Sequence, residues 1–308
     1  MAIHLAVSFF LSLIGLLSPN VFGAENSVEV GCPQLPVESI ERSLPFFSKA
    51  LEFKVASQEQ NSGHPKSRVA HLSLGDECLD LIEYSDIKSA HVPVDSRAND
   101  LWFQHIAIVV SDMDLAYKKL RKAGVRSTSN VPQTLPTSNV AAAGISAFYF
   151  LDPDGHSLEL IHFPPGKGQK KWQEKKDSGL FLGIDHTAIT VSNTASSLEF
   201  YQDRLHLMVV GGSENFGVEQ DHLNGVFNSH VIITSLRGDS GIGIEFLEFM
   251  TPQAGRALSK TTRITDLVSW QIPVTIGEDN LQRAKNKVSE LQDPDGHRIL
   301  LRQKGQTK

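Results

Sequence analysis

The stretch "FYFLDPDGHSLELI" at residues 148–161 contains two short apolar runs joined by Asp-Pro-Asp-Gly. Pro153 suits the second position of a type I turn, and Gly155 suits the left-handed position that closes a hairpin. The flanking runs therefore predict a pair of antiparallel strands. The same turn recurs in "ELQDPDGHRILL" at 290–301, but Leu300 stands where the first copy has Glu159. A duplicated unit has kept its turn and lost a carboxylate.

A strand followed by a helix occurs four times along the chain. Each copy opens with an alternating apolar run and continues into a segment whose apolar residues recur at helical spacing. The copies lie at 30–56, 103–125, 183–210 and 269–288. Strand-like runs such as "VAHLSL" and "CLDLIEY" follow the helices. The pattern predicts an α+β protein of four tandem βαβββ modules that form two domains.

The fourth module is shorter than the others. Leu115 is separated from the turn at Asp152 by 37 positions, but the equivalent Leu281 is separated from Asp293 by only 12. The difference of about 25 residues predicts the loss of about two strands. We therefore expect a first domain at 28–165, a solvated linker at 166–180 and a second domain at 181–304 that contains the shortened module.

The first residues predict export. An apolar run at 5–18, "LAVSFFLSLIGLLS", is too short to cross a bilayer comfortably, and small residues at Gly23 and Ala24 follow it. This is the pattern of a secretory signal peptide at 1–24, although no Lys or Arg precedes the run. An uncleaved membrane anchor is the alternative. We expect a periplasmic or secreted protein without a stable membrane span after cleavage.

The net charge restricts the class of binding partner, and the cysteine content restricts the possible disulfides and metal sites. A net charge of -6 offers no electrostatic footprint for nucleic acid. The partner expected is a small-molecule substrate, and the sequence leaves open a monomer or a homodimer. The chain has two cysteines, Cys32 and Cys78. They either form a disulfide in an oxidising compartment, or Cys32 remains free to form a second metal site with Asp80.

Tandem βαβββ modules with an F-x-D-P-D-G-H turn, here at 150–156, resemble the vicinal oxygen chelate (VOC) superfamily. That superfamily includes glyoxalase I, extradiol dioxygenases, epimerases and bleomycin-resistance proteins. The resemblance covers about residues 28 to 302. It implies that modules close in pairs around a cleft. It also implies metal ligands on the first strand of each module, usually His, and on the last strand, usually Glu.

The positions that the resemblance marks as ligands are unevenly filled. The second and third modules carry the family's usual residues, namely His105, Glu159, His186 and Glu245, whereas the outer modules carry Cys32, Asp80, Gln271 and Leu300. Pairing of neighbouring modules would leave two broken sites. Pairing of the second module with the third would collect all four usual ligands in one cleft. We therefore expect the second pairing.

Each of these side chains also has an ordinary structural interpretation. A His in an apolar strand is often a hydrogen-bonded core residue, and Glu159 on an alternating strand can simply face solvent. If the four act together, they suit one divalent ion such as Zn²⁺, Ni²⁺, Fe²⁺ or Mn²⁺. His156 and His297 follow both turns and are expected to be structural, and Glu248 is expected on the face opposite Glu245. His222, Asn224 and His230 are weaker candidates for substrate contacts.

The predicted chemistry follows from such an ion. Two neighbouring oxygens of a substrate would chelate it, and Glu159 or Glu245 would take the adjacent proton as a catalytic base. This is lyase or isomerase chemistry, although glyoxalase I itself acts on a cytoplasmic glutathione adduct. An extradiol dioxygenase, which needs two His and one carboxylate on Fe²⁺, is the first alternative. A metal-free protein that binds a small molecule is the second.

Overall fold

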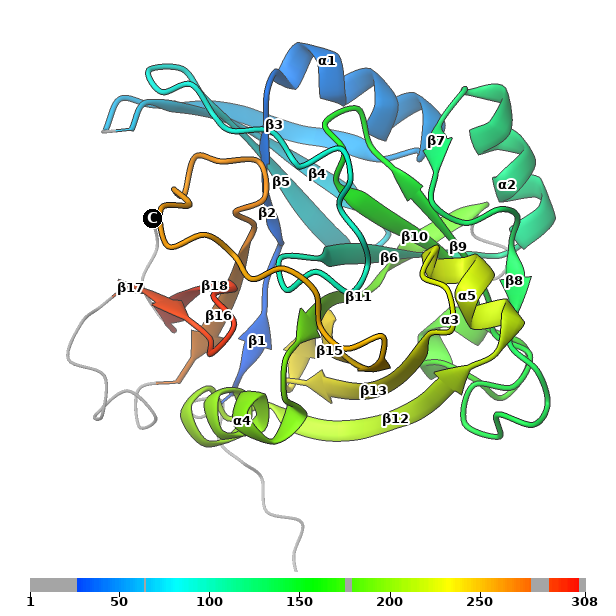
Figure 1. The fold of residues 1–308 in the computed structure, drawn as a ribbon. Coiled ribbons are helices and arrows are strands. Elements are labelled where there is room, and N and C mark those ends of the chain that lie inside the picture. The colour runs from blue at the N-terminus through cyan, green and yellow to red at the C-terminus, as the bar shows by residue number, and fades with distance from the viewer. Residues whose placement is uncertain (1–26, 64, 175–178, 278–287, 305–308) are drawn as a thin grey trace, which may run out of the picture.

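The structure, a computed structural model, describes residues 27–63, 65–174, 179–277 and 288–304. The predicted signal peptide and most of the helix expected in the fourth module lie outside these residues. The described part forms two nine-stranded sheets, and its short helices connect strands within the same sheet (Figure 1). No helix within it is long and apolar enough to cross a membrane.

One sheet, here called the inner sheet, is built from the second and third predicted modules. Its strands follow the order β12-β13-β15-β11-β6-β10-β9-β7, and β8 pairs with β9. The bounds are β6 Gln104–Val110, β7 Arg126–Ser127, β8 Gln133–Thr134, β9 Ser146–Leu151, β10 Ser157–His162, β11 Phe181–Val191, β12 Met208–Phe216, β13 His230–Arg237 and β15 Gly243–Thr251. The first strands of the two modules, β6 and β11, pair antiparallel at its centre. The expected pairing of the second module with the third is confirmed.

The other sheet, the outer sheet, combines the beginning and the end of the chain. Its order is β14-β1-β16-β2-β5-β4-β3, with β18 on β16 and β17 on β18. The bounds are β1 Glu29–Val30, β2 Gln34–Val37, β3 Lys54–Asn61, β4 Ser67–Leu74, β5 Glu77–Tyr84, β14 Ser240–Gly241, β16 Gln271–Ile276, β17 Val288–Gln292 and β18 Arg298–Gln303. The fourth module contributes three described strands, whereas the first contributes β2, β3, β4 and β5 in addition to the two-residue β1. Among the described residues one outer strand is therefore missing, not the two expected, because β17 is kept and pairs along β18.

The helices are short, and α1, α2 and α4 begin at polar caps. They are α1 Ile40–Pro45, which continues as a widened turn at Phe46–Ala50, α2 Met113–Lys122, α3 Lys170–Glu174, α4 Thr194–Leu198, continued at Glu199–Arg204, and α5 Val218–Asn224. Ser39, Asp112 and Asn193 each accept a hydrogen bond from a backbone N–H of the first turn of α1, α2 and α4. The helical starts expected from the sequence rest on these side chains.

A single large apolar core lies behind both sheets. Alternate residues of each strand, such as Ile106 and Ile108 of β6 or Leu79 and Leu81 of β5, pack into it with α2 and the turn after α1. The residues between them, including His105 and Asp80, point to the opposite face of their sheet. Each sheet therefore has one face in the common core and one face turned away from it. The candidate sites lie on the faces turned away.

The expected linker at 166–180 is not solvated throughout. Its residues Lys170–Glu174 form α3, and Trp172 is 1% exposed. The Trp172 ring packs with Val109, Phe163 and Leu182 on the inner sheet. A lysine-rich composition predicted exposure, but one aromatic side chain is enough to hold the segment against the sheet.

Candidate metal centre

Four side chains from four strands meet on one face of the inner sheet. His105 comes from β6, Glu159 from β10, His186 from β11 and Glu245 from β15. The strand register brings them together, because Glu159 and His186 both pair with Ala107, which lies two residues after His105. Glu245 pairs with Ala188, two residues after His186. The two halves of the sheet thus repeat one arrangement of His and Glu.

The distances between these side chains fit a shared ion. Glu159 Oε2 lies 3.1 Å from His105 Nε2 and 3.6 Å from His186 Nε2, and His186 Nε2 lies 3.3 Å from Glu245 Oε2. Two donor atoms that are each about 2.1 Å from one ion, at angles of about 90 to 120°, are about 3.0 to 3.6 Å apart. The observed separations lie in this interval.

His105 supplies the clearest sign that the site is built for a ligand. Its side chain is 1% exposed, and neither ring nitrogen has an aligned hydrogen bond with the described residues. A buried imidazole without partners costs about 1 to 3 kcal/mol. The Nε2 atom is close to Glu159, but it is not aligned for hydrogen bonding to it. A cation between His105 Nε2 and the Glu159 carboxylate would give each of these groups a partner.

His186 is oriented by a carboxylate from its own strand. Asp185 Oδ2 lies 3.0 Å from His186 Nδ1, which leaves Nε2 directed at the two glutamates. Arg237 donates to Asp185 at 2.8 Å, and the Trp172 indole N–H also donates to it. A second carboxylate behind an imidazole is the usual support of a metal-binding His, because it fixes the ring and raises its basicity.

The two glutamates differ in exposure. The Glu159 side chain is 6% exposed and lies against both imidazoles, whereas that of Glu245 is 21% exposed. Ser235 Oγ donates a hydrogen bond of 2.6 Å to Glu245 Oε1. Three atoms, from His105, Glu159 and His186, lie within 4.8 Å of one another. Glu245 is therefore the outermost member and the one that solvent or a substrate can reach.

The charges around the site favour the binding of a cation. Burial raises the pKa of Glu159, but the imidazoles of His105 and His186 outweigh it and hold this pKa at about 2. Burial lowers the pKa of His186, but Glu245, Asp185 and Glu159 outweigh it and raise this pKa well above the usual range. The protein thus surrounds His186 with carboxylates and draws a proton onto it. A divalent cation would take that place.

Two apolar clusters border the four side chains. On one side, Trp172 of α3 packs with Val109 and Phe163. On the other, Phe103, Tyr149 and neighbouring residues pack under Leu223 of α5. The His105 and Tyr149 rings have centroids 4.8 Å apart. The charged group thus lies between two apolar clusters, and its most exposed member is Glu245 on β15, beside Ser235 of β13.

Comparisons with known proteins agree with this architecture. The sequence model of the Glyoxalase/Bleomycin resistance protein/Dioxygenase superfamily matches residues 29–160. This part of the chain belongs to that superfamily. The match ends at the last strand of the second module, one residue beyond Glu159.

Relatives with known names show how far the superfamily likeness extends. A segment of 113 residues, 37% of this chain, is 28% identical to glyoxalase I of Saccharomyces cerevisiae and spans 31% of that protein's length. Glyoxalase I from Zea mays superposes with a TM-score of 0.61 at 14% identity, over 90% of this chain and 92% of the maize chain. A candidate dioxygenase from Bacillus subtilis superposes with a TM-score of 0.58 at 13% identity, over 92% and 87%. The structural matches show a shared fold across both sheets.

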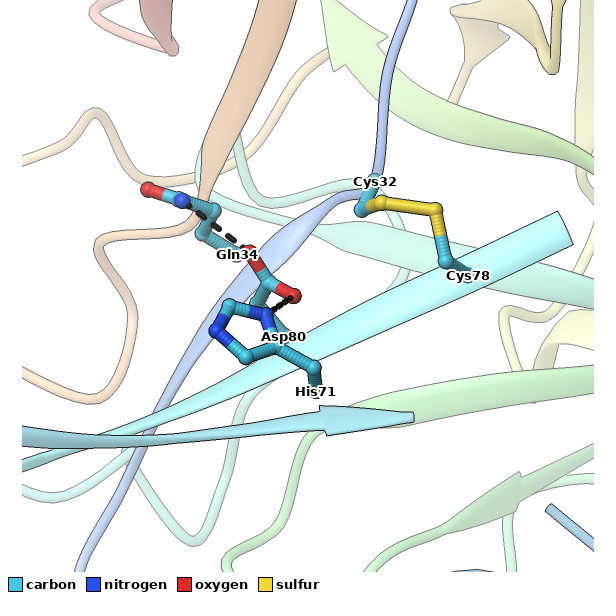
Figure 2. Close-up of a disulfide and its surroundings, with 5 residues drawn as sticks. All are labelled: Cys32, Gln34, His71, Cys78 and Asp80. Atoms are coloured by element: carbon cyan, nitrogen blue, oxygen red, sulfur yellow. Dashed lines mark hydrogen bonds and ion pairs between the residues drawn. A yellow bond between two sulfur atoms is a disulfide. The ribbon is translucent and has the colours of Figure 1, made fainter. Parts of the chain in front are cut away.

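The outer sheet lacks the superfamily's usual ligands at the equivalent positions. Cys32 and Cys78 form a disulfide, which excludes the alternative of a free Cys32 thiol beside Asp80 (Figure 2). Gln271 and Leu300 lie at the remaining two positions, on β16 and β18. A proline, Pro273, pairs with Leu300. The sheet has kept the strands of the repeat and changed the side chains that the fold does not need.

The weaker candidates have local partners. Asn224 bonds to Ser229 and to the backbone N–H of Val226 within the loop after α5, and His230 lies 2.7 Å from Glu214 on the surface. His222 is exposed on α5. Glu248 accepts a hydrogen bond from the first backbone N–H of α4, on the face opposite Glu245. None of these residues lies with the four side chains.

Sequence reasoning missed three residues that support the site. Asp185, Ser235 and Tyr149 each contact one of the four side chains. Asp185 is next to His186 in the sequence, and adjacent residues of a regular strand point to opposite faces. A register shift between Ile184 and His186 brings the Asp185 carboxylate round to the imidazole. Ser235 and Tyr149 are cross-strand partners of Glu245 and Glu159, so the register was the signal needed to find them.

Proposed function

We propose that this chain is an exported, divalent-metal-dependent enzyme of the VOC superfamily. Its reaction would be of the lyase or isomerase type, on a small substrate with two neighbouring oxygens. The observation that carries the proposal is the convergence of His105, Glu159, His186 and Glu245 at separations suited to one ion. The apolar run at 5–18 and the Cys32–Cys78 disulfide support export, because disulfides persist in oxidising compartments.

His105, His186 and Glu159 would hold the ion, with Glu245 as the fourth ligand. When bound, such an ion binds the two substrate oxygens and stabilises the negative charge that develops when a neighbouring proton leaves. The other three side chains are almost completely buried, which leaves Glu245 as the carboxylate nearest to solvent. It would therefore take the proton from the substrate carbon and return it at the adjacent atom, while Ser235 orients it.

The apolar clusters serve the same chemistry. Phe103 and Tyr149 exclude water from the buried end of the cleft. A low local dielectric strengthens the attraction between the ligand carboxylates and the ion, and it keeps the substrate charge from being screened. Glu159, held between two imidazoles, stays ionised under these conditions and would keep the ion in place.

A second function is favoured by one observation, the compactness of the His105, Glu159 and His186 group without Glu245. Two His and one carboxylate form the ligand set of non-haem Fe²⁺ oxygenases, which leave positions open for catecholate and O₂. With this set Glu245 would serve as a base beside the ion. Oxygen uptake with a panel of catechols, after anaerobic loading with Fe²⁺, separates the two functions: sustained uptake supports the oxygenase, and its absence supports the isomerase or lyase.

The shared ion is tested by metal analysis of the purified full chain. We expect about one divalent ion per chain in the wild type and its loss, or at least a tenfold weaker retention against a chelator, in His105→Ala and His186→Ala. His91→Ala is the matched control, because His91 is largely exposed and lies outside the site. Full metal content in both site variants, with unchanged affinity, would contradict the shared site, and a wild type that retains no divalent ion would favour a metal-free binding protein.

A further inference from the structure

The outer sheet repeats the register of the inner sheet with different side chains. Asp80 pairs with Gln34 and with His71, as Glu159 pairs with Ala107 and Tyr149 in the inner sheet. Gln271 pairs with Gln34, as His186 pairs with Ala107. Asp80 and Gln271 thus lie where the inner sheet has Glu159 and His186, and together with Gln34 and His71 they form a polar group on the outer sheet.

This polar group is not suited to a metal. Figure 2 shows His71 and Gln34 directed at the two oxygens of Asp80 beside the disulfide. His71 Nδ1 lies 2.7 Å from Asp80 Oδ1, and Gln34 Nε2 donates to Asp80 Oδ2 at 3.3 Å. The other ring nitrogen of His71 lies 3.3 Å from Glu59. The imidazole and the carboxylate are therefore already engaged with protein groups, and the two amides remain as the groups that a ligand would meet.

An open cavity of about 640 Å³ lies over this face of the sheet. The strand alternation explains its lining, because Ile82 and Tyr84 follow Asp80 at every second position of β5, and Val69 pairs with Ile82 on β4. Gln34 and Gln271 line its floor and are 8% and 6% exposed. Its volume lies within the range of about 300 to 1,000 Å³ that is typical of small-molecule sites.

Gln271 is 6% exposed, and its amide faces the cavity without a hydrogen bond to any described residue, whereas its neighbour Gln34 has one. An apolar side chain of this size would cover the same floor without leaving polar atoms at the cavity. Leu300, on the same sheet, shows that the fold accepts an apolar residue at a former ligand position. A buried glutamine directed at a cavity therefore points to a ligand.

The chemistry of the lining selects the kind of ligand. Among the described lining residues there is no Lys, Arg or His, and the carboxylate, Glu59, lies 3.3 Å from His71, so these residues offer an anion no opposite charge. An amide offers donors and an acceptor, and a hydroxyl group does the same, so neighbouring hydroxyls can satisfy both glutamines without a charge. Val69, Ile82 and the Tyr84 ring add an apolar surface for the C–H face of a ring.

We propose that the outer sheet binds a neutral, hydroxyl-rich small molecule of the sugar or polyol class between Gln34, Gln271 and the apolar surface of β4 and β5. This second site is separate from the candidate metal centre, because it lies on the other sheet. The outer half of the chain would then be a binding module as well as a scaffold.

The test is titration of the full chain with D-glucose, trehalose, choline and citrate, followed by NMR of the glutamine side-chain amides. We expect saturable shifts with glucose or trehalose and none with choline or citrate. Gln271→Leu should weaken this binding roughly tenfold or more, because two hydrogen bonds are lost. Its melting temperature should be equal or higher, since the substitution removes an unpartnered amide.

Two further variants separate this proposal from the metal centre. Gln58→Leu makes the same change on an exposed residue of β3 outside the cavity and should leave binding intact. His186→Ala should lose metal and keep sugar binding, so the two sites can fail independently. Binding of choline or citrate alone, no binding of any probe, or equal sugar affinity in folded Gln271→Leu would each overturn the proposal.

Discussion

At the scale of single residues, the support behind His186 would decide how well the candidate centre holds an ion. Asp185 binds the Nδ1 side of the ring, and Arg237 and Trp172 fix the carboxylate in turn. The imidazole therefore cannot rotate away from Glu159 without breaking this chain of contacts. Residues that orient a ligand are nearly as important for metal affinity as the ligand itself.

This gives a prediction for Asp185→Asn, which keeps the shape of the side chain and removes its charge. We expect the affinity for a divalent ion to fall by about 10- to 100-fold, because the amide no longer fixes the ring or raises its basicity. Chelator competition against the wild type measures it. Asp114→Asn, an exposed residue on α2, is the matched control. An unchanged affinity in a folded Asp185→Asn would show that the carboxylate has only a packing role.

That the four candidate ligands lie together could be predicted from the sequence, but their surroundings could not. His105, Glu159, His186 and Glu245 occupy repeated positions, so a comparison of the modules finds them. Ser235 and Tyr149 become neighbours only through the pairing of β13 with β15 and of β9 with β10. Such pairs depend on the register, which a single strand does not encode.

At the scale of elements, each Asp-Pro-Asp-Gly turn connects its own sheet to a helix of the other sheet by hydrogen bonds. Asp152 Oδ1 accepts the backbone N–H groups of Asp154 and His156 at 2.8 Å, which closes the turn. Asp154 reaches α1, where it accepts from Ser43 Oγ at 3.2 Å. In the second copy, Asp295 accepts the backbone N–H of Ser192 before α4 at 2.8 Å. Both turns were kept because each one ties a strand pair to a helix of another module.

The contacts of His156 show which charge the first turn requires. Its Nδ1 lies 2.8 Å from Asp152 Oδ2 and its Nε2 lies 2.8 Å from the carbonyl oxygen of Leu267. Both partners are acceptors, so both ring nitrogens must carry a proton. Burial lowers the pKa of His156, but the Asp152 carboxylate outweighs it and raises this pKa above the usual range. The turn therefore contains a buried imidazolium and a carboxylate.

The pH dependence of stability follows from this pair. The pKa of His156 is higher in the folded than in the unfolded chain, so its contribution is complete below the unfolded value of about 6.5 and is lost as the pH rises through the folded value. We expect His156→Gln to lower the free energy of unfolding by about 1 to 3 kcal/mol at pH 5.5, and by less at alkaline pH. Urea unfolding at both pH values measures this.

Exposed His91→Gln is the control for the loss of an imidazole and should change the free energy of unfolding little at either pH. A difference between wild type and His156→Gln that grows as the pH rises would contradict a buried imidazolium. The presence of a histidine in both copies of the turn, at His156 and His297, would then need another explanation.

At the scale of the whole molecule, the pairing of modules could be predicted from the sequence. The residues typical of metal ligands lie in the two middle modules, and the two outer modules carry other residues at the equivalent positions. Two features of the assembly left no such signal. β1 pairs with β14, so the start of the chain joins the outer sheet to a strand of the third module. Trp172, within a lysine-rich segment, closes one end of the inner cleft. Each depends on contacts between residues far apart in the sequence.

The division of the molecule into two sheets predicts that the disulfide and the metal centre can be separated. Cys32 and Cys78 are 46 residues apart and join β5 to the segment before β2 in the outer sheet. Closing a loop of this length lowers the entropy of the unfolded chain and stabilises the fold by about 2 to 4 kcal/mol. We expect the double variant Cys32→Ser, Cys78→Ser to lose a free energy of unfolding in this range, measured in urea, and to keep the metal content of the wild type. Wild type unfolded with a reductant should match it. Loss of metal from a double variant that is still folded would mean that the outer sheet shapes the inner cleft directly, because the disulfide touches none of the four side chains of the centre.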